Sequence, residues 1–251
     1  MKLIITDDYK ALSVASAKMV ADTINQKQTT VLGLATGSTP VGLYQELISL
    51  YINKQVDFSH VTTFNLDEYV GLSPGHPQSY HKFMYDNFFN HVNISQENIH
   101  IPKGDNPELE EECAQYEEKI ESVGQIDIQV LGIGENGHIG FNEPGSDPNG
   151  CTSLVKLSES TVEANARFFG DKELVPRLAI SMGLKTILDS SKHVLLLASG
   201  EKKAGALYQM VYGEVSEDVP ATFLQHHRNV TVIADKDAAK KLPKSDLIAG
   251  L

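Results

Sequence analysis

At residues 132–145 the chain reads GIGENGHIGFNEPG, and this glycine-rich stretch directly follows an apolar run at 126–131. A short apolar run of that kind is typical of a buried strand in a parallel sheet. In open α/β sheets, ligands bind at the carboxyl ends of strands, where loops of small residues let them approach the backbone. His138 and Glu143 are five residues apart here, so they can converge within a loop. The stretch therefore predicts a histidine oriented by a carboxylate, which is a common acid/base arrangement.

The same stretch contains the spacing G-x-G-x-x-G, which also occurs in dinucleotide-binding folds. That motif needs a helix to begin at its third glycine, here Gly137, so that the helix N-terminus faces the pyrophosphate. The residues that follow, His-Ile-Gly-Phe-Asn-Glu-Pro-Gly, do not favour a helix. We therefore expect no nicotinamide or flavin cofactor at this loop.

Composition restricts the classes of protein and of partner. With 251 residues, of which 41% are hydrophobic and 22% charged, the chain has the profile of a soluble globular protein, and we expect one domain over 1–251. Its net charge of −12 is repelled by nucleic acid and by anionic membranes, so we expect neither as a partner. A bound phosphate would need a few local cations and backbone N–H groups.

The cysteines and the apolar runs bear on the compartment. The two cysteines, Cys113 and Cys151, form no CxxC pair, which argues against a disulfide framework or a cysteine zinc site and suits a reducing cytosol. No run approaches the ~18 apolar residues that a membrane span needs. We therefore expect a cytoplasmic protein.

Short apolar runs alternate with helical patterns along the chain. We expect strands near 3–6, 31–35, 61–66, 126–131, 178–180, 193–198 and 229–234, with helices between them and an irregular stretch at 146–158. This alternation is typical of an α/β fold with a doubly wound, open, mostly parallel sheet and helices on both faces.

Polar loops follow the strands that end near residues 35, 66, 131 and 198. Thr36, Gly37, Ser38 and Thr39 precede a helix and either hold an anion at its N-terminus or simply cap it. Because parallel strands share one edge of a sheet at their carboxyl ends, we expect all four loops to meet there.

Two pairs of charged residues lie in these loops. Asp67 and Glu68 serve as a base or metal ligands, or else they begin a solvated loop or cap a helix. Lys202 and Lys203 lie at the start of a predicted helix, where the helix dipole favours negative rather than positive charge. Their position indicates either a bound anion or two solvated lysines.

Taken together, the motifs resemble the glucosamine-6-phosphate deaminase family over about residues 1–240. The resemblance rests on ATGSTP at 35–40, FNLDEYVGL at 64–72, GHIGFNEPG at 137–145, ANARFF at 164–169 and GEKKA at 200–204. The related 6-phosphogluconolactonases share a Gly-His element, but the run at 141–144 is similar to the deaminase branch. The family converts glucosamine 6-phosphate and water into fructose 6-phosphate and ammonia.

The resemblance implies a role for each candidate residue. His138 would open the sugar ring, Glu143 would orient it, and Asp67 would move a proton from C2 to C1, with no metal or organic cofactor. The phosphate would be held by residues that are distant in sequence: Thr36, Gly37, Ser38, Thr39, Arg167 and Lys203. A small sugar phosphate is therefore the expected partner, and the chain is expected to be a monomer or a small homo-oligomer.

One catalytic position departs from part of the family. Some members have aspartate where this chain has Asn136, so a titrating third acid is absent, while the His138–Glu143 pair is complete. Two other functions remain open, a phosphosugar lactonase that needs only histidine and water, and a sugar-phosphate sensor without catalysis. The stretch 146–156 has one cation, Lys156, so we expect no second, allosteric sugar-phosphate site.

Overall fold

The computed structural model describes residues 1–243 and is built on a parallel sheet. Its seven strands lie in the order β1 (Lys2–Thr6), β10 (Val230–Asp235), β9 (Val194–Ala198), β6 (Ile128–Gly132), β2 (Thr30–Leu34), β3 (Val61–Asn65) and β5 (Ile99–His100). Every neighbouring pair runs parallel. The doubly wound α/β fold expected from the sequence is confirmed.

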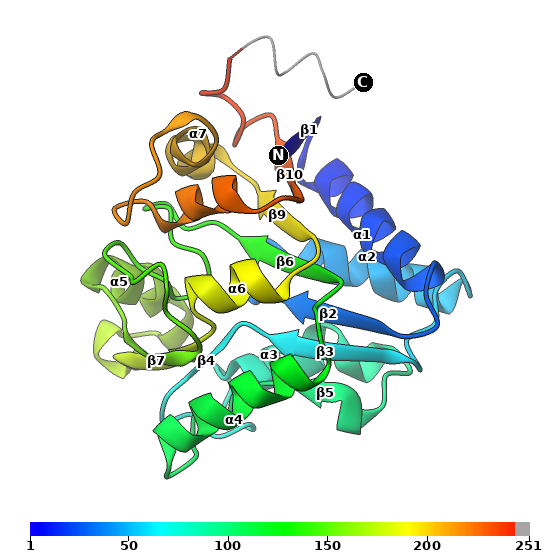
Figure 1. Cartoon of the computed structure of the whole chain (residues 1–251), viewed down its shortest axis with the longest axis horizontal. Coiled ribbons are helices and arrows are strands. Elements are labelled where there is room, and N and C mark those ends of the chain that lie inside the picture. The colour runs from blue at the N-terminus through cyan, green and yellow to red at the C-terminus, as the bar shows by residue number, and fades with distance from the viewer. Residues whose placement is uncertain (244–251) are drawn as a thin grey trace.

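The helices form two groups that cover the sheet. One group contains α1 (Tyr9–Asn25), α2 (Val41–Ile52) and α3 (Tyr80–Asn87), which contact one another in series. The other contains α4 (Leu109–Ser122), α6 (Leu184–Ser190), the 3-10 helix η5 (Pro220–His226) and α7 (Ala204–Tyr212). Figure 1 shows α4 and α6 crossing in front of the strands. Within residues 1–243, no helix has both the length and the hydrophobicity that crossing a bilayer requires.

Local sequence explains where the first helix begins and which face it buries. The Asp8 carboxylate accepts a hydrogen bond from the Ala11 backbone N–H at 2.8 Å and so caps α1. Leu12, Val20 and Ile24 recur at helical spacing and are buried on one face. The strands at the centre of the sheet are covered on both sides, and all five residues of β9 are buried. Such strands appear in sequence as continuous apolar runs, which is why they could be located.

A second, antiparallel sheet was not expected from the sequence. It has the order β4 (Asp67–Tyr69), β8 (Leu178–Ser181) and β7 (Ser153–Lys156). The prediction of an irregular stretch at 146–158 was therefore wrong for β7, and residues 67–69 form a strand rather than a loop. Both strands are short, and their hydrogen bonds go to β8, which is remote in sequence. No local pattern encodes such pairing.

A small helical layer packs on this second sheet. It contains α5 (Glu159–Phe169) and the 3-10 helix η3 (Lys172–Leu174). Its apolar contacts form a cluster separate from the main core, made by Tyr69, Phe141, Leu157, Val162, Val175 and Ala179. The remaining 3-10 helices are η1 (Phe89–His91), η2 (Gln96–Asn98) and η4 (Glu201–Lys203).

The order of the main sheet brings the polar loops together. Strands β9, β6, β2 and β3 are consecutive neighbours, so their carboxyl ends lie side by side. In Figure 1 their arrowheads point toward the side of the molecule where β4, β7 and α5 lie. The second sheet and α5 therefore lie across the sheet edge at which α/β folds bind ligands.

A close backbone contact fixes the position of β4. A Cβ atom at Gly104 would lie 1.9 Å from the Tyr69 carbonyl oxygen, and the Gly71 N–H donates to the Gly104 carbonyl at 2.8 Å. We expect Gly104→Ala to lower the free energy of unfolding by roughly 1–3 kcal/mol, because backbone must move to admit the methyl group. Urea denaturation measures this. Gly75→Ala is the control, since nothing lies within 4 Å of its Cβ position, and an equal loss there would contradict the explanation.

Candidate active site

A cavity of about 550 Å³ lies at the carboxyl ends of the central strands. It is lined by all but one of the residues selected from the sequence, namely Thr36, Gly37, Ser38, Thr39, Asp67, Asn136, His138, Arg167 and Lys203. The exception, Glu143, lies behind His138. The expected convergence of the four loops is therefore what the structure shows.

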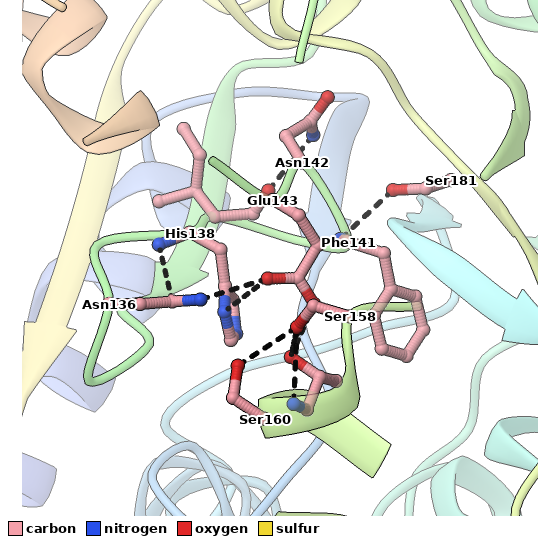
Figure 2. A network of polar contacts seen from close by, with 10 residues as sticks. Asn136, His138, Phe141, Asn142, Glu143, Ser158, Ser160 and Ser181 are labelled. Carbon is pink, nitrogen blue, oxygen red and sulfur yellow. Dashed lines mark hydrogen bonds and ion pairs between the residues drawn. The ribbon is translucent and has the colours of Figure 1, made fainter. Parts of the chain in front are cut away.

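The glycine-rich loop brings Asn136, His138 and Glu143 together (Figure 2). One carboxylate oxygen of Glu143, Oε2, accepts a hydrogen bond from Asn136 Nδ2 at 2.9 Å and lies 3.5 Å from His138 Nδ1. Asn136 Oδ1 also accepts from the His138 backbone N–H at 3.2 Å. Among the described residues His138 Nε2 has no hydrogen-bond partner. Nδ1 is buried and faces Glu143 without a hydrogen bond among the described residues, so the ring meets the carboxylate through an electrostatic contact, and Nε2 remains available to a ligand.

Contacts on both sides of the loop fix the histidine. A Cβ at Gly134 would lie 2.3 Å from His138 Cε1, so only glycine lets the imidazole pack across this position. On the other side, Ser181 Oγ accepts from the Phe141 N–H at 3.1 Å, and Asn142 Nδ2 donates to the Met182 carbonyl at 2.8 Å. No helix begins at Gly137, so the glycine pattern does not form a dinucleotide-binding turn.

Glu143 is buried but remains ionised. Burial alone would raise its pKa, but the nearby His138 imidazole and the hydrogen bonds from Thr161 and Asn136 outweigh burial and lower the pKa to about 2. The Thr161 hydroxyl donates to the second carboxylate oxygen, Oε1. Glu143 therefore presents a permanent negative charge to the imidazole over the whole physiological pH range.

Asp67 has the opposite environment. It is 6% exposed, and no hydrogen bond from the described residues reaches its carboxylate. Burial, with a smaller contribution from the charge of Glu68, raises the pKa of Asp67 to about 8. Because it faces the cavity, Asp67 presents a carboxyl group of raised proton affinity where a ligand can meet it.

The neighbouring acid, Glu68, has a structural position. Successive side chains of β4 point to opposite faces, so Glu68 lies away from the cavity at the start of α3. Its carboxylate accepts the backbone N–H groups of Tyr69, Tyr80 and His81 at 2.8–2.9 Å. Burial raises its pKa to about 7, against these three hydrogen bonds. Of the alternatives open from sequence, Glu68 helps to cap α3 beside the N-cap residue Ser79, and neither acid is solvated.

Aromatic hydroxyl groups surround Asp67 without donating to it. Tyr80 lines the cavity, and its hydroxyl donates to that of Tyr69 at 3.3 Å. Burial raises the pKa of Tyr69, Tyr80 and two further tyrosines, Tyr44 and Tyr116, and the negative charge of Asp67 adds to each shift. The phenols therefore stay neutral. Tyr80 was not selected from the sequence, because tyrosines at helix starts are common.

The loop at 36–39 forms another wall of the cavity and leads into α2. Pro40, at the N-cap of α2, provides no side-chain cap. The hydroxyl of Tyr9 in α1 replaces it, accepting from the Gly42 N–H at 2.8 Å and sharing its one proton between the carbonyls of Ser38 and Thr39, at 3.1 and 3.0 Å. Tyr9 therefore fixes the loop from outside the cavity, a long-range role that the sequence did not reveal.

Two cations lie near this loop. Burial lowers the pKa of Lys203, while the nearby Glu135 counteracts the shift and Arg167 adds to it. Arg167 is exposed at the end of α5, with its guanidinium carbon 4.6 Å from the centre of the Phe168 ring. Lys202 has an 81% exposed side chain and pairs with Glu135 at 3.7 Å. Of the two adjacent lysines, Lys203 is thus the one enclosed by the protein.

Within residues 1–243, no three His, Cys, Asp or Glu side chains are grouped so that they could hold a metal ion. Asp67 and Glu68, which were candidate ligands, point to opposite faces of β4.

The raised pKa of Asp67 predicts a pH-dependent gain in stability for Asp67→Asn. The folded protein keeps a proton on Asp67 that the unfolded chain, with a pKa near 3.8, releases. The wild type therefore loses stability as pH rises from about 4 to 8, whereas asparagine has no proton to lose. We expect both proteins to be similarly stable near pH 4, and Asp67→Asn to be more stable by on the order of a few kcal/mol at pH 9.

Thermal denaturation across this pH range provides the measurement. Asp189→Asn, at an exposed position, is the matched control and should show no such trend. A stability difference for Asp67→Asn that does not change with pH would contradict the assignment of a buried, protonated carboxyl group.

Comparisons with known proteins agree with this site. Residues 7–233 match the family model described as glucosamine-6-phosphate isomerases/6-phosphogluconolactonase. Glucosamine-6-phosphate deaminase 2 of Bacillus subtilis (strain 168) is 61% identical over 96% of this chain and 98% of its own length. The enzyme named glucosamine-6-phosphate deaminase from Thermoanaerobacter sp. (strain X514) is 55% identical over 98% of this chain and 97% of its own length.

Solved structures give the same result. A structure described as a monomeric glucosamine-6-phosphate deaminase superposes with a TM-score of 0.94 at 48% identity, covering 96% of this chain and all of that one. The 6-phosphogluconolactonase from Trypanosoma cruzi superposes at 0.76 with 20% identity, covering 96% of each chain, and shows a shared fold. This chain belongs to the glucosamine-6-phosphate isomerase/6-phosphogluconolactonase family.

Proposed function

We propose that the protein converts D-glucosamine 6-phosphate and water into D-fructose 6-phosphate and ammonia, a step of N-acetylglucosamine breakdown. The observation that carries the proposal is that Asp67 faces the cavity without a hydrogen bond from the described residues, whereas Glu143, behind His138, accepts from Asn136 and Thr161, and the pKa values shift in opposite directions, to about 8 and about 2. Opposite environments of this kind separate the acid and base roles of two similar groups. The names of the relatives at 55–61% identity support the same reaction.

His138 and Glu143 act in ring opening. The imidazole takes the proton of the anomeric hydroxyl and returns it to the ring oxygen, so the hemiacetal becomes an open-chain aldehyde. Nε2 faces this transfer, because Nδ1 is turned toward Glu143 at 3.5 Å. The ionised Glu143 favours the imidazolium that forms in between. Asn136 donates to Glu143 and thereby assists the carboxylate without titrating itself.

Asp67 then removes the proton from C2 and delivers it to C1. Burial, with no donor among the described residues, makes it more basic than an ordinary aspartate, which suits abstraction from carbon. The ammonium group of the substrate, placed beside it, favours the ionised carboxylate. Proton transfer through the enolamine gives an imine at C2, and water adds to that carbon and releases ammonia.

The remaining residues hold the phosphate. The backbone N–H groups of the loop at 36–39, together with Arg167 and Lys203, supply positive charge at one wall of a protein whose net charge is −12. The pairing of a planar guanidinium with a phosphate is strong and directional.

A phosphosugar lactonase is the second candidate. The shared fold and His138 suit hydrolysis of a lactone by water. That reaction gives no task to Asp67, whereas the structure keeps this carboxylate buried at the cavity at a cost in stability. We therefore prefer the deaminase.

We further propose that the protein acts in the cytoplasm as a monomer or a small homo-oligomer. The relative that superposes with a TM-score of 0.94 is described as monomeric. The two cysteines, Cys113 and Cys151, are free, as in a reducing compartment.

The first expected result is release of ammonia from glucosamine 6-phosphate by the purified wild type. Asp67→Asn should reduce turnover by about 10²- to 10⁴-fold and abolish exchange of the C2 hydrogen with solvent, because the base is gone. Ammonia is measured by a coupled assay and exchange by NMR in D₂O. Hydrolysis of 6-phosphogluconolactone without ammonia release would favour the second candidate, and C2 exchange in the variant would remove Asp67 from its role.

The second expected result concerns the phosphate. Lys203→Ala and Arg167→Ala should each weaken substrate binding by roughly 1.5–3 kcal/mol, or about 10- to 150-fold, the scale of a hydrogen bond to a charged group. KM and inhibition by inorganic phosphate report the loss. Lys18→Ala, an exposed position on α1, controls for the change in net charge. If the variants turned over unphosphorylated glucosamine and its 6-phosphate in the wild-type ratio, these cations would not bind the phosphate.

A further inference from the structure

Helix α5 contributes side chains to the site near both of its ends. Thr161 is in its first turn and Arg167 in its last, and both line the cavity. At 1.5 Å per residue they are separated by about 9 Å along the helix axis. The helix packs through Val162, Ala166 and Phe169 on the small apolar cluster, outside the main core. These contacts hold α5 as one unit, so a displacement at one of its ends is passed to the other.

At the N-terminal end, a chain of hydroxyl groups leads to Glu143 (Figure 2). Ser158 is the N-cap of α5, and its Oγ accepts the Thr161 N–H and contacts Thr161 Oγ1, both at 3.2 Å, and Ser160 Oγ at 3.0 Å. The ionised Glu143 can only accept, so Thr161 must donate to it. Ser158 must then donate to Thr161, and Ser160 to Ser158.

This chain fixes the rotation of the Glu143 carboxylate. Among the described residues, Thr161 is the only hydrogen-bond donor to Oε1, while Asn136 and His138 lie at Oε2. Thr161 is 5% exposed, so water has little access to replace it. The carboxylate also rests at a helix N-terminus, where the helix dipole favours a negative charge. The orientation of Glu143 toward His138 thus depends on the placement of α5.

We propose that Thr161 is a positioning residue that couples phosphate binding at Arg167 to the ring-opening pair through α5. The inference rests on the proposed function of both groups. A phosphate held by Arg167 and a carboxylate held by Thr161 stabilise the same placement of one rigid helix. Phosphate binding at Arg167 therefore favours the placement of Thr161 that orients the Glu143 carboxylate, and this placement favours phosphate binding in return. A substrate without a phosphate would leave the histidine less well oriented.

Two substitutions at Thr161 separate the hydroxyl group from packing. Thr161→Val keeps the shape and loses the donor, whereas Thr161→Ser keeps the donor and loses a methyl group. We expect Thr161→Val to lower kcat/KM for glucosamine 6-phosphate by about 10- to 100-fold, with Thr161→Ser within about threefold of the wild type. A purely structural role would give the reverse order, which would overturn the proposal, as would wild-type activity in Thr161→Val.

A matched control removes the same kind of bond elsewhere. Thr186 Oγ1 donates to the Glu117 carboxylate at 2.8 Å, is 2% exposed and lies on α6. Thr186→Val should destabilise the protein to a similar extent in thermal denaturation while leaving kcat/KM unchanged. A comparable fall in kcat/KM in this control would show that lost stability alone accounts for the effect, and would overturn the proposal.

Inorganic phosphate tests the coupling without catalysis. Isothermal titration of the full-length protein should show that Thr161→Val weakens phosphate binding about 3- to 10-fold when Arg167 is present, but not in the Arg167→Ala background. Equal effects in both backgrounds, or none in either, would overturn the coupling. The outcome does not require ammonia release, so failure of the proposed reaction and failure of the coupling are distinguishable.

Discussion

The site depends on keeping two buried carboxylates in opposite electrostatic environments. Asp67 receives no hydrogen bond from the described residues and has a pKa raised to about 8, while Glu143 receives two, from Asn136 and Thr161, and has a pKa lowered to about 2. Both are nearly inaccessible to water, so the number of donors decides the direction of each shift. The proposed base, Asp67, binds a proton more tightly because no donor stabilises its charge. The proposed orienting group, Glu143, stays ionised because its donors stabilise the charge. Two acids of similar intrinsic strength thereby differ by several orders of magnitude in proton affinity.

The fold supplies these environments through two sheets with different tasks. The parallel sheet aligns the ends of four strands and so brings distant loops to one cavity. The antiparallel sheet then orients side chains, because the alternation of β4 sends Asp67 to the cavity and Glu68 to the start of α3. A shift of one residue in the pairing of β4 with β8 would exchange these two acids. The register of the three residues of β4 therefore decides which of the two acids faces the cavity.

The sequence predicts the first of these two sheets well and the second poorly. Buried parallel strands appear as apolar runs, so β2, β3, β6 and β9 and the loops after them could be located, and nine of the ten selected residues line the cavity. β4 and β7 could not be located, because their pairing with β8 is long-range and leaves no local period. For the same reason the sequence showed that Asp67 and Glu68 are adjacent, but not that they face opposite sides. Tyr9 and Thr161 were missed because each acts through one hydroxyl on a partner remote in sequence.

The asparagine at position 136 has a physical consequence in this network. An ionised aspartate there would offer only acceptors to Glu143 Oε2, and the two negative charges would repel each other. Asn136 instead donates through Nδ2 and accepts the His138 N–H through Oδ1, so a single neutral side chain connects the acid to the backbone of the histidine. With Thr161 at the other oxygen, Glu143 has a fixed donor on each side, while Nε2 of His138 has no hydrogen-bond partner among the described residues.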